Sequence, residues 1–423
     1  MKRVMKKTIF KHQGMTGKKL AERYDLLCRV SNAKLLEHDN EQSEIEELIR
    51  LVRDELPAIT RHGIPEKAVD IQSRLLLAVE NLRMFCIYPS LRSKRFIAIG
   101  GAFSAGKSTL INSLLGKDVL VADIDPTTSV PTNITQGDKD AYFVLNKFWQ
   151  STEIKQREFL DLTHEEEMKY GSSITSLLKF SHVTRKTFPW KNFAIIDTPG
   201  YSRPDGNNKT DENLARTQLS SADMLIWVIS AKSGGITEED IKFLISLHNE
   251  VPCLIVVSRA DAVPAEDLRN VVQLIRQTLI KHKISFDDVL PVSSRNKDAF
   301  GYEALIQYLE KFDSVYFAPK WVNDFLLPIE LELYIRTHQT KLAKQKMLIN
   351  TISSLADAPE ALAAAEAINT AIEQSTLQWK SVSEQLEDWQ KRFYKHIENM
   401  GFSSIATIVI DRKKDKGPDV NLP

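Results

Sequence analysis

The residues with the clearest chemical purpose lie in the segment 101–108, which reads GAFSAGKS. This is the spacing G-x-x-x-x-G-K-[ST], in which glycines let successive backbone N–H groups wrap the oxygens of a phosphate chain. Lys107 would contact the β- and γ-phosphates, and the hydroxyl of Ser108 would bind Mg²⁺. The residues expected to touch the nucleotide here are Phe103, Ser104, Ala105, Gly106, Lys107, Ser108 and Thr109. The spacing therefore predicts a site for a nucleoside triphosphate with magnesium.

Two later segments offer the remaining contacts to the γ-phosphate. The segment 125–132 reads DPTTSVPT, and its Thr128 would place a hydroxyl on Mg²⁺ and an N–H near the γ-phosphate. The segment 193–200 reads FAIIDTPG; Asp197 would hold Mg²⁺ through water and the N–H of Gly200 would reach the γ-phosphate. Because Pro/Thr/Ser loops and D-x-P-G turns are also common as plain turns, both assignments depend on the phosphate loop before them.

The segment 258–261 reads SRAD, in the place where guanine-binding proteins carry [NT]-K-x-D. The carboxylate of Asp261 can accept hydrogen bonds from N1–H and the 2-amino group of guanine, which adenine lacks. Arg259 can lie over the base, and Ser258 keeps a hydroxyl but has less reach than Asn. Further along, Ser293 and Ser294 are expected to touch the base. The alternative is that Asp261 only caps the next helix.

Four apolar runs would position these residues, and continuous apolar runs suit parallel strands buried on both faces. The runs are 96–99, 193–196, 224–229 and 253–257. We therefore expect an α/β fold: a P-loop GTPase domain with a mostly parallel sheet, flanked by N- and C-terminal α-helical segments. The expected boundaries are a helical segment at 1–92, the GTPase domain at 93–318, and a second helical segment at 319–423.

Three features of the N- and C-terminal helical segments can each be interpreted in two ways. The stripe Trp379, Val382, Leu386, Trp389 and Phe393 is typical of a bundle core, and less often of a partner surface. The apolar stretch 402–410 fits a packed strand or a membrane-touching tip. The basic, acid-free stretch 1–19 fits a solvated tail or a contact with anionic lipid.

Composition excludes several classes of protein. Among 423 residues, the 56 Lys and Arg balance the 56 Asp and Glu, so no nucleic-acid partner is expected. Three cysteines without paired spacing predict reduced thiols in a cytoplasmic protein, without a disulfide framework. No apolar run approaches the length of a membrane span, and the N-terminus lacks the apolar region of a secretory signal.

The motifs GAFSAGKSTLIN, PTT, DTPG and SRAD, in this order, resemble the dynamin superfamily and its bacterial dynamin-like branch over about residues 93–318. The long interval between Thr128 and Asp197 is similar to the insertions of dynamin-type domains. The resemblance implies GTP or GDP as ligand, GTP hydrolysis with Mg²⁺, and a neck bundle built from both chain ends. The sequence departs from the family at SRAD and in having only about 105 residues after the domain.

Tyr201 follows Gly200 where Ras-type enzymes carry the glutamine that orients water. The resemblance implies that Ser104 takes this role, with Lys107 and Thr128 as the other catalytic residues, aided by a monovalent cation and a facing GTPase domain. The partners implied are a second copy, as a GTPase-domain dimer or oligomer, or a second dynamin-like chain. An anionic membrane, contacted peripherally, is a further expected partner.

The leading hypothesis is a dynamin-like GTPase whose dimerisation-stimulated hydrolysis is coupled to membrane association or remodelling. Two alternatives remain at this stage. One is a GTP-gated switch that recruits a protein or RNA partner without membrane activity. The other is a weakly hydrolysing subunit of a hetero-oligomer. The helical flanks favour the first hypothesis over the RNA-binding switch, because no appended segment interleaves basic with aromatic residues.

Overall fold

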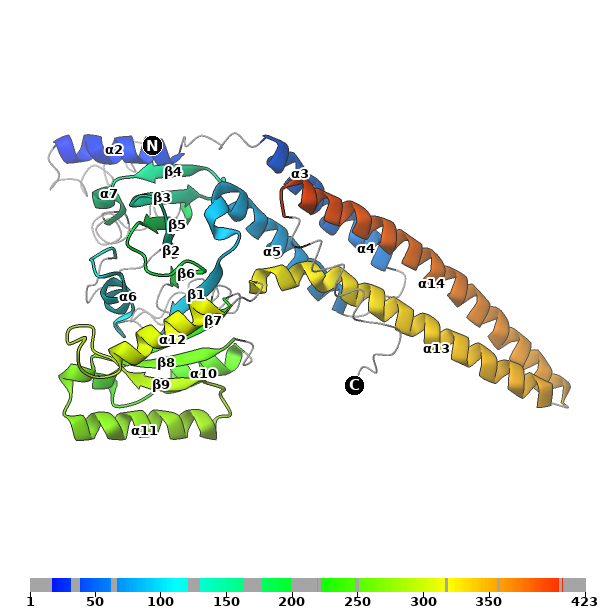
Figure 1. Ribbon diagram of the computed structural model, residues 1–423. Coiled ribbons are helices and arrows are strands. Elements are labelled where there is room, and N and C mark those ends of the chain that lie inside the picture. The colour runs from blue at the N-terminus through cyan, green and yellow to red at the C-terminus, as the bar shows by residue number, and fades with distance from the viewer. Residues whose placement is uncertain are drawn as a thin grey trace, which may run out of the picture. The chain divides into compact units, whose positions relative to one another are not determined.

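The computed structural model describes residues 17–31, 39–61, 67–102, 104–120, 130–160, 162, 177–198, 219, 222–247, 251–315, 319–355, 358–402 and 405. The chain divides into two compact units (Figure 1). The sheet unit comprises Met1–Leu36 and Ile87–Lys320, and the helical unit comprises Glu37–Cys86 and Trp321–Pro423.

The sheet unit is built on a nine-stranded sheet of order β4-β3-β5-β2-β6-β1-β7-β8-β9. Its strands are β1 (Arg95–Gly100), β2 (Thr132–Gln136), β3 (Ala141–Asn146), β4 (Ser151–Ile154), β5 (Leu178–Arg185), β6 (Phe193–Asp197), β7 (Met224–Ser230), β8 (Cys253–Ser258) and β9 (Asp288–Pro291). From β6 to β9 every neighbouring pair is parallel, and β2 also pairs in parallel with β5. The pairs β2–β6, β3–β5 and β3–β4 are antiparallel. The expected mostly parallel sheet is confirmed.

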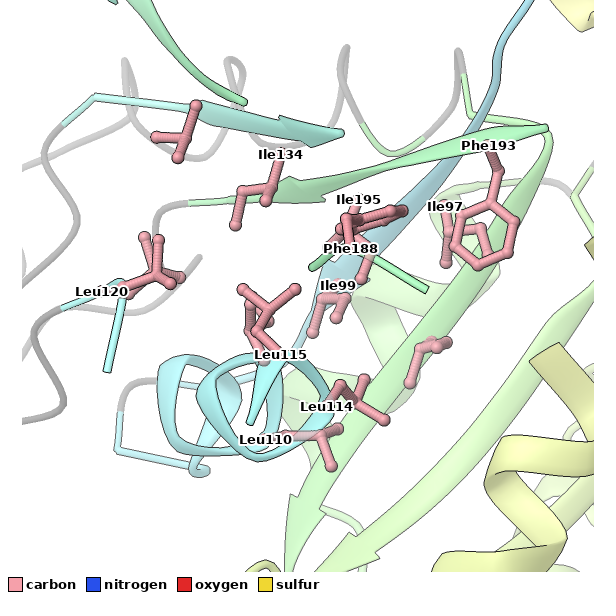
Figure 2. Packing of buried hydrophobic residues seen from close by; sticks show 14 of the residues in the cluster. Ile97, Ile99, Leu110, Leu114, Leu115, Leu120, Ile134, Phe188, Phe193 and Ile195 are labelled. Atoms are coloured by element: carbon pink, nitrogen blue, oxygen red, sulfur yellow. The ribbon is translucent and has the colours of Figure 1, made fainter. Parts of the chain in front are cut away.

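The four apolar runs form the strands β1, β6, β7 and β8. Both faces of these strands are buried, so neither face requires polar side chains. Strands β1, β6 and β8 are buried at every position, and β7 at all but its last. The helices of this unit are α2 (Gly17–Ser31), α6 (Lys107–Leu115), α7 (Gln156–Leu160), α10 (Glu238–Ser246), α11 (Ala265–Lys281) and α12 (Tyr302–Ser314), with 3₁₀ turns at Pro89–Leu91, Ala231–Ser233 and Ala260–Ala262. Figure 2 shows Leu110 and Leu115 of α6 packed near Ile99 and Ile195 of the sheet. This packing holds the start of α6 at the end of β1.

Helix α2 differs from the expectation that residues 1–92 form one neck segment. Its Leu26 and Val30 are buried in the same core as the sheet. The side-chain amide of Asn146 donates to the carbonyl of Val30 (2.9 Å), and the hydroxyl of Thr152 donates to the carbonyl of Arg29 (3.2 Å). The apolar spacing of α2 predicts a helix with one buried face, but spacing alone does not specify which core that face joins.

The helical unit combines two segments of the chain, one before and one after the residues 87–320 of the sheet unit. Its helices are α3 (Asp39–Arg50), a π-helical turn (Leu51–Glu55), α4 (Leu56–Thr60), α5 (Lys67–Ile87), α13 (Leu327–Leu355) and α14 (Pro359–Asn399), with a 3₁₀ stretch at Lys320–Leu326. The indole N–H of Trp389 donates to the carbonyl of Leu51 (2.9 Å), and the amide of Gln390 donates to the carbonyl of Pro328 (2.8 Å). The expected bundle of both chain ends is therefore present, and the stripe from Trp379 to Phe393 is its buried core.

Parts of two flank predictions lie outside the described residues. Of the stretch 402–410, only Phe402 and Ile405 are described, and both are buried; Phe402 packs edge-on against Trp321. Of the basic stretch 1–19, residues 1–16 lie outside the described part. Within the described ranges, no helix combines the length and apolar character that crossing a bilayer requires.

Candidate nucleotide site

The phosphate loop leaves the end of β1 in a conformation that two positions can adopt only as glycine. Gly101 has φ +138° and Gly106 has φ +96°. A Cβ at Gly101 would lie 2.3 Å from the carbonyl oxygen of Val228, so β7 and the loop approach too closely for any side chain. Ser104 also takes a left-handed conformation, with φ +56°. The loop then turns into α6 at Lys107, which directs free N–H groups at the position of a phosphate.

Lys107 is buried inside this loop. Its ammonium donates to the carbonyls of Gly101 (3.1 Å) and Ala102 (3.0 Å). Burial lowers the pKa of Lys107 to about 8, while the carboxylates of Asp197 and Asp240 act in the opposite direction. The lysine therefore lies folded against its own loop, close to the phosphate position that the sequence predicts.

Asp197 and Ser108 lie where the magnesium ligands are expected. Asp197 ends β6 and pairs in register with Ile99 of β1, the strand that precedes the loop. Its neighbour Thr198 donates its hydroxyl to the carbonyl of Ile99 (2.8 Å), which fixes the end of β6 against β1. Ser108 lies in the first turn of α6. One buried carboxylate and one hydroxyl fit Mg²⁺, which takes few protein ligands and completes its shell with water and phosphate oxygens.

Within the described ranges, no group of three or more His, Cys, Asp or Glu side chains gathers into a metal site. Magnesium in nucleotide sites does not need such a group, because the nucleotide supplies ligands.

Ser258, at the end of β8, ties the predicted base-reading segment to the phosphate loop. Its hydroxyl donates to the carbonyl of Ala105 (2.6 Å), and the side chain is buried. The serine thus reaches the loop despite being shorter than asparagine. Next to it Arg259 is exposed with φ +55°, so its guanidinium has room to lie over a base.

Asp261 is exposed and its carboxylate is held in place from the next strand. The hydroxyl of Ser293 donates to Oδ1 of Asp261 (2.7 Å), and the backbone N–H of Asn296 donates to Ser293 Oγ (2.9 Å). Ser293 is fully buried, so it orients Asp261 and has no free surface for the base. Ser294 is half-buried beside it. Among the described residues the carboxylate of Asp261 accepts this one side-chain hydrogen bond, so both of its oxygens keep lone pairs for a guanine edge.

The strand order brings most predicted residues together. The loops after β1, β6, β8 and β9 leave the same edge of one sheet, because these strands are linked by parallel pairs through β7. The phosphate-loop residues follow β1, and Asp197 ends β6. The residues proposed to contact the base lie at or after the ends of β8 and β9. The residues so placed are Ser104, Ala105, Gly106, Lys107, Ser108 and Thr109 at β1, and Ser258, Arg259, Asp261, Ser293 and Ser294 at β8 and β9. Phe103, Thr128, Gly200 and Tyr201 lie outside the described residues.

Two residues of this region are absent from the sequence prediction. Asn112 accepts from the N–H groups of Val119 and Leu120 and donates to the carbonyl of Leu120, so α6 fixes the chain just before segment 121–129. Asp240 is buried, caps α10 with Thr237, and accepts from the indole of Trp227 (3.1 Å). The pattern T-x-x-D before an apolar run signals that cap, but its proximity to Lys107 depends on tertiary packing.

Three comparisons relate this geometry to known proteins. Residues 97–260 match the model of the family described as "Dynamin family". The chain is 26% identical over 242 residues to Dynamin-like protein 2 of Campylobacter jejuni subsp. jejuni serotype O:23/36 (strain 81-176), covering 55% of this chain and 37% of that protein. It is 28% identical over 230 residues to Dynamin-like protein 1 of the same strain, covering 46% and 31%. The chain thus matches about a third of the length of each relative.

A solved structure titled as an oligomerised bacterial dynamin pair that senses and tethers membranes aligns with 91% of this chain and 77% of its own. The sequence identity is 17% and the TM-score is 0.40.

Proposed function

We propose that the chain binds GTP with Mg²⁺ and hydrolyses it, and the match of residues 97–260 to the model described as "Dynamin family" supports this proposal. The observation that carries the proposal is the joint placement of Lys107, Asp197 and Asp261 at one edge of the sheet. In this arrangement Lys107 would neutralise the phosphates, Asp197 would bind magnesium and Asp261 would recognise guanine, all in the same nucleotide. Ser258 and Ser293 support this assignment, because each braces one part of the site against another.

The chain's own groups would act as follows. The ammonium of Lys107 would leave the carbonyls of Gly101 and Ala102 for phosphate oxygens, which offer a full negative charge in place of two dipoles. Asp261 would accept N1–H and the 2-amino group of guanine. Magnesium, held by Ser108, Asp197 and Thr128, would neutralise charge that develops on the β- and γ-phosphates. Ser104, half-buried on the loop, would hold the attacking water, with a monovalent cation as a further aid.

We further propose that two GTPase domains, from two copies or from this chain and a second dynamin-like chain, face one another during hydrolysis. Coupling to a membrane surface is the last part of the proposal. The two Campylobacter relatives are named as dynamin-like proteins, and the bundle formed from both chain ends is the neck that the resemblance implies.

The nucleotide assignment is tested by calorimetry of the wild-type chain and Lys107→Ala with a non-hydrolysable GTP analogue and Mg²⁺. We expect binding by the wild type and a loss of at least tenfold in affinity for the variant, since a charged hydrogen bond contributes about 1.5–3 kcal/mol. Equal affinity of the two proteins would end the assignment of this site.

The membrane part is tested separately, by co-sedimentation with anionic liposomes in the presence and absence of GTP. GTP-dependent sedimentation is expected. A chain that hydrolyses GTP but stays in the supernatant in both cases would instead be a switch acting on a protein or RNA partner.

A further inference from the structure

The outer half of the hairpin formed by α13 and α14 exposes large apolar side chains. Figure 1 shows the two helices running side by side to a common end. Leu348, Ile352 and Leu355 are 64%, 54% and 77% exposed and form one stripe on α13, because residues i, i+4 and i+7 share a face. Ile368 on α14 is 46% exposed. We call Leu348, Ile352, Leu355 and Ile368 the tip surface.

The tip surface is separate from the seam that holds the two helices together. That seam buries Leu342, Ala365 and Ile372. Across it Lys346 pairs with Glu373 (2.9 Å), and the amide of Asn369 donates to Asn350 (3.1 Å). These two contacts place residue 350 level with 369, so Ile368 lies level with the interval between Leu348 and Ile352. Ile368 therefore lies level with a point within the α13 stripe from Leu348 to Leu355, and exposed apolar side chains gathered on a surface mark an interaction site.

The charges around the tip surface are segregated by helix. From Leu333 to Leu355 the chain has no acidic residue and includes Lys341, Lys344 and Lys346. From Pro359 to Trp379 it has no Lys or Arg and includes Glu360, Glu366 and Glu373. The side chains of Lys341 and Glu360 form no ion pair or hydrogen bond within the described part of the chain. An apolar surface with an unpaired cation at one end and an unpaired anion at the other is complementary to itself.

We propose that the tip surface binds the tip surface of a second copy of this chain, antiparallel, about a two-fold axis level with Asn350. Leu348 of one copy then meets Ile352 of the other, since the two residues lie equally far on either side of the axis. Ile368 approaches its own counterpart. Lys341 lies about nine residues, roughly 14 Å, on one side of the axis, and Glu360 lies about as far on the other. The two-fold therefore brings Lys341 of each copy level with Glu360 of its partner.

This partner is favoured over a lipid surface by the same charges. An anionic membrane would repel Glu360 and Glu366 beside the apolar residues, whereas a second hairpin supplies a lysine. The interface uses no residue of the nucleotide site, so it is tested without nucleotide and stands apart from GTP hydrolysis.

The first experiment is sedimentation velocity of the full chain, free of nucleotide, at concentrations from about 1 to 100 µM. We expect a monomer–dimer equilibrium in the wild type. The variant Leu348→Glu/Ile352→Glu is expected to raise the dissociation constant at least tenfold, because it buries unpaired charge at the centre of the contact. Ile280→Glu is the matched control: this residue of α11 is 67% exposed and lies outside the surface, so its dissociation constant should equal that of the wild type.

The second experiment tests the register with a charge exchange. Lys341→Glu and Glu360→Lys should each weaken the dimer severalfold, and the double variant should restore it, because the pair is re-formed with its signs reversed. In a Cys28→Ser background, Ile368→Cys should link two chains with a short bismaleimide. Leu377→Cys, 69% exposed on the same helix, should link far less.

Three results would overturn the proposal. One is a wild type that stays monomeric over the whole range. Another is a dimer that survives Leu348→Glu/Ile352→Glu, which would assign association to another surface. The third is a monomeric wild type whose co-sedimentation with anionic vesicles is abolished by that variant, which would assign the tip surface to lipid.

Discussion

Asp261 is proposed to select the base, and among the described residues the hydroxyl of Ser293 donates to its carboxylate. Asp261→Asn replaces an acceptor by a group that donates as well, so it should lose affinity for GTP and gain affinity for xanthosine triphosphate. The expected loss is about 1.5–3 kcal/mol, or one to two decades. Competition binding with the two nucleotides measures the exchange.

Ser293→Ala serves as the comparison for this exchange. It frees the carboxylate without changing its chemistry, so GTP affinity should fall by a smaller factor and xanthosine triphosphate should gain nothing. Wild-type protein that binds ATP and GTP equally would contradict the role given to Asp261.

If Lys107 binds the phosphates as proposed, nucleotide binding should depend on pH. Its pKa in the folded, nucleotide-free chain is about 8, below the ordinary value of 10.5, because burial disfavours the charged form. Between these values the unfolded chain holds a proton that the folded chain has lost, so the stability of the nucleotide-free protein rises with pH through this window. Binding of GTP needs the charged ammonium, so affinity should fall as pH passes above 8.

The decline should approach tenfold for each pH unit above the pKa, as linkage of one proton requires. Titration with a fluorescent GDP analogue between about pH 7 and 9 measures it. Lys107→Ala provides the baseline, because ionisation of the nucleotide affects both proteins. Parallel curves for the two would show that binding is not linked to the charge of Lys107.

Residue types and spacing were sufficient to predict that the segments proposed to bind phosphate, magnesium and base lie at the ends of apolar strands, as they do at β1, β6 and β8. They did not reveal that Ser293 is buried and orients Asp261. A serine that contacts a base and a serine that orients a carboxylate look the same in the sequence. Nor did they reveal Asp240 beside Lys107, because the two are brought together only when α10 packs beside β7. Contacts between residues close together in the chain can be predicted from the sequence, whereas contacts between separate helices and strands depend on how these elements pack.

The same distinction holds for whole elements. The continuous apolar runs predicted β1, β6, β7 and β8, and the stripe from Trp379 to Phe393 predicted the bundle core. Strands β2, β4 and β5 mix polar and apolar residues, and the apolar run 141–145 of β3 was not among the strands predicted. Helix α2 was expected in the neck but packs with the sheet unit. The sequence predicts that one face of this helix is buried, but not which core buries it.

Helix α14 is fixed to the π-helical turn by Trp389, whose indole donates to Leu51. Trp389→Phe removes a buried donor and leaves a small cavity, so the free energy of unfolding of the helical unit should fall by about 1–3 kcal/mol. Trp379→Phe is the matched control, because the indole nitrogen of Trp379 makes no hydrogen bond with any described residue. Urea denaturation followed by circular dichroism compares the two, and an equal loss would contradict the importance of the Leu51 contact.

At the scale of the whole molecule, GTP turnover should depend on how many chains are present. A lone domain without a water-orienting glutamine should hydrolyse slowly, like unassisted Ras at about 10⁻⁴–10⁻³ s⁻¹. If two GTPase domains face one another, turnover per molecule should rise with concentration, and Ser104→Ala should remove the rise while leaving GTP affinity nearly intact. Steady-state assays across about two decades of dilution measure this.

A flat wild-type profile, or a Ser104→Ala protein as active as the wild type, would favour the simple switch. Leu348→Glu/Ile352→Glu separates the two kinds of association: it should abolish nucleotide-free dimers without preventing the rise in turnover at high concentration.

The order of the two units along the chain has a consequence for biosynthesis. Residues 37–86 leave the ribosome early, but their core partners in α13 and α14 follow only after the whole sheet unit. Leu51 and Trp389 are 338 residues apart, so at about 5–20 residues per second the former waits roughly 17–70 s for the latter. During that interval the apolar faces of α3, α4 and α5 lack their final partners. We therefore expect chaperones that bind apolar segments to contact the nascent chain during synthesis of residues 87–320, and to stay bound to a chain truncated before α14.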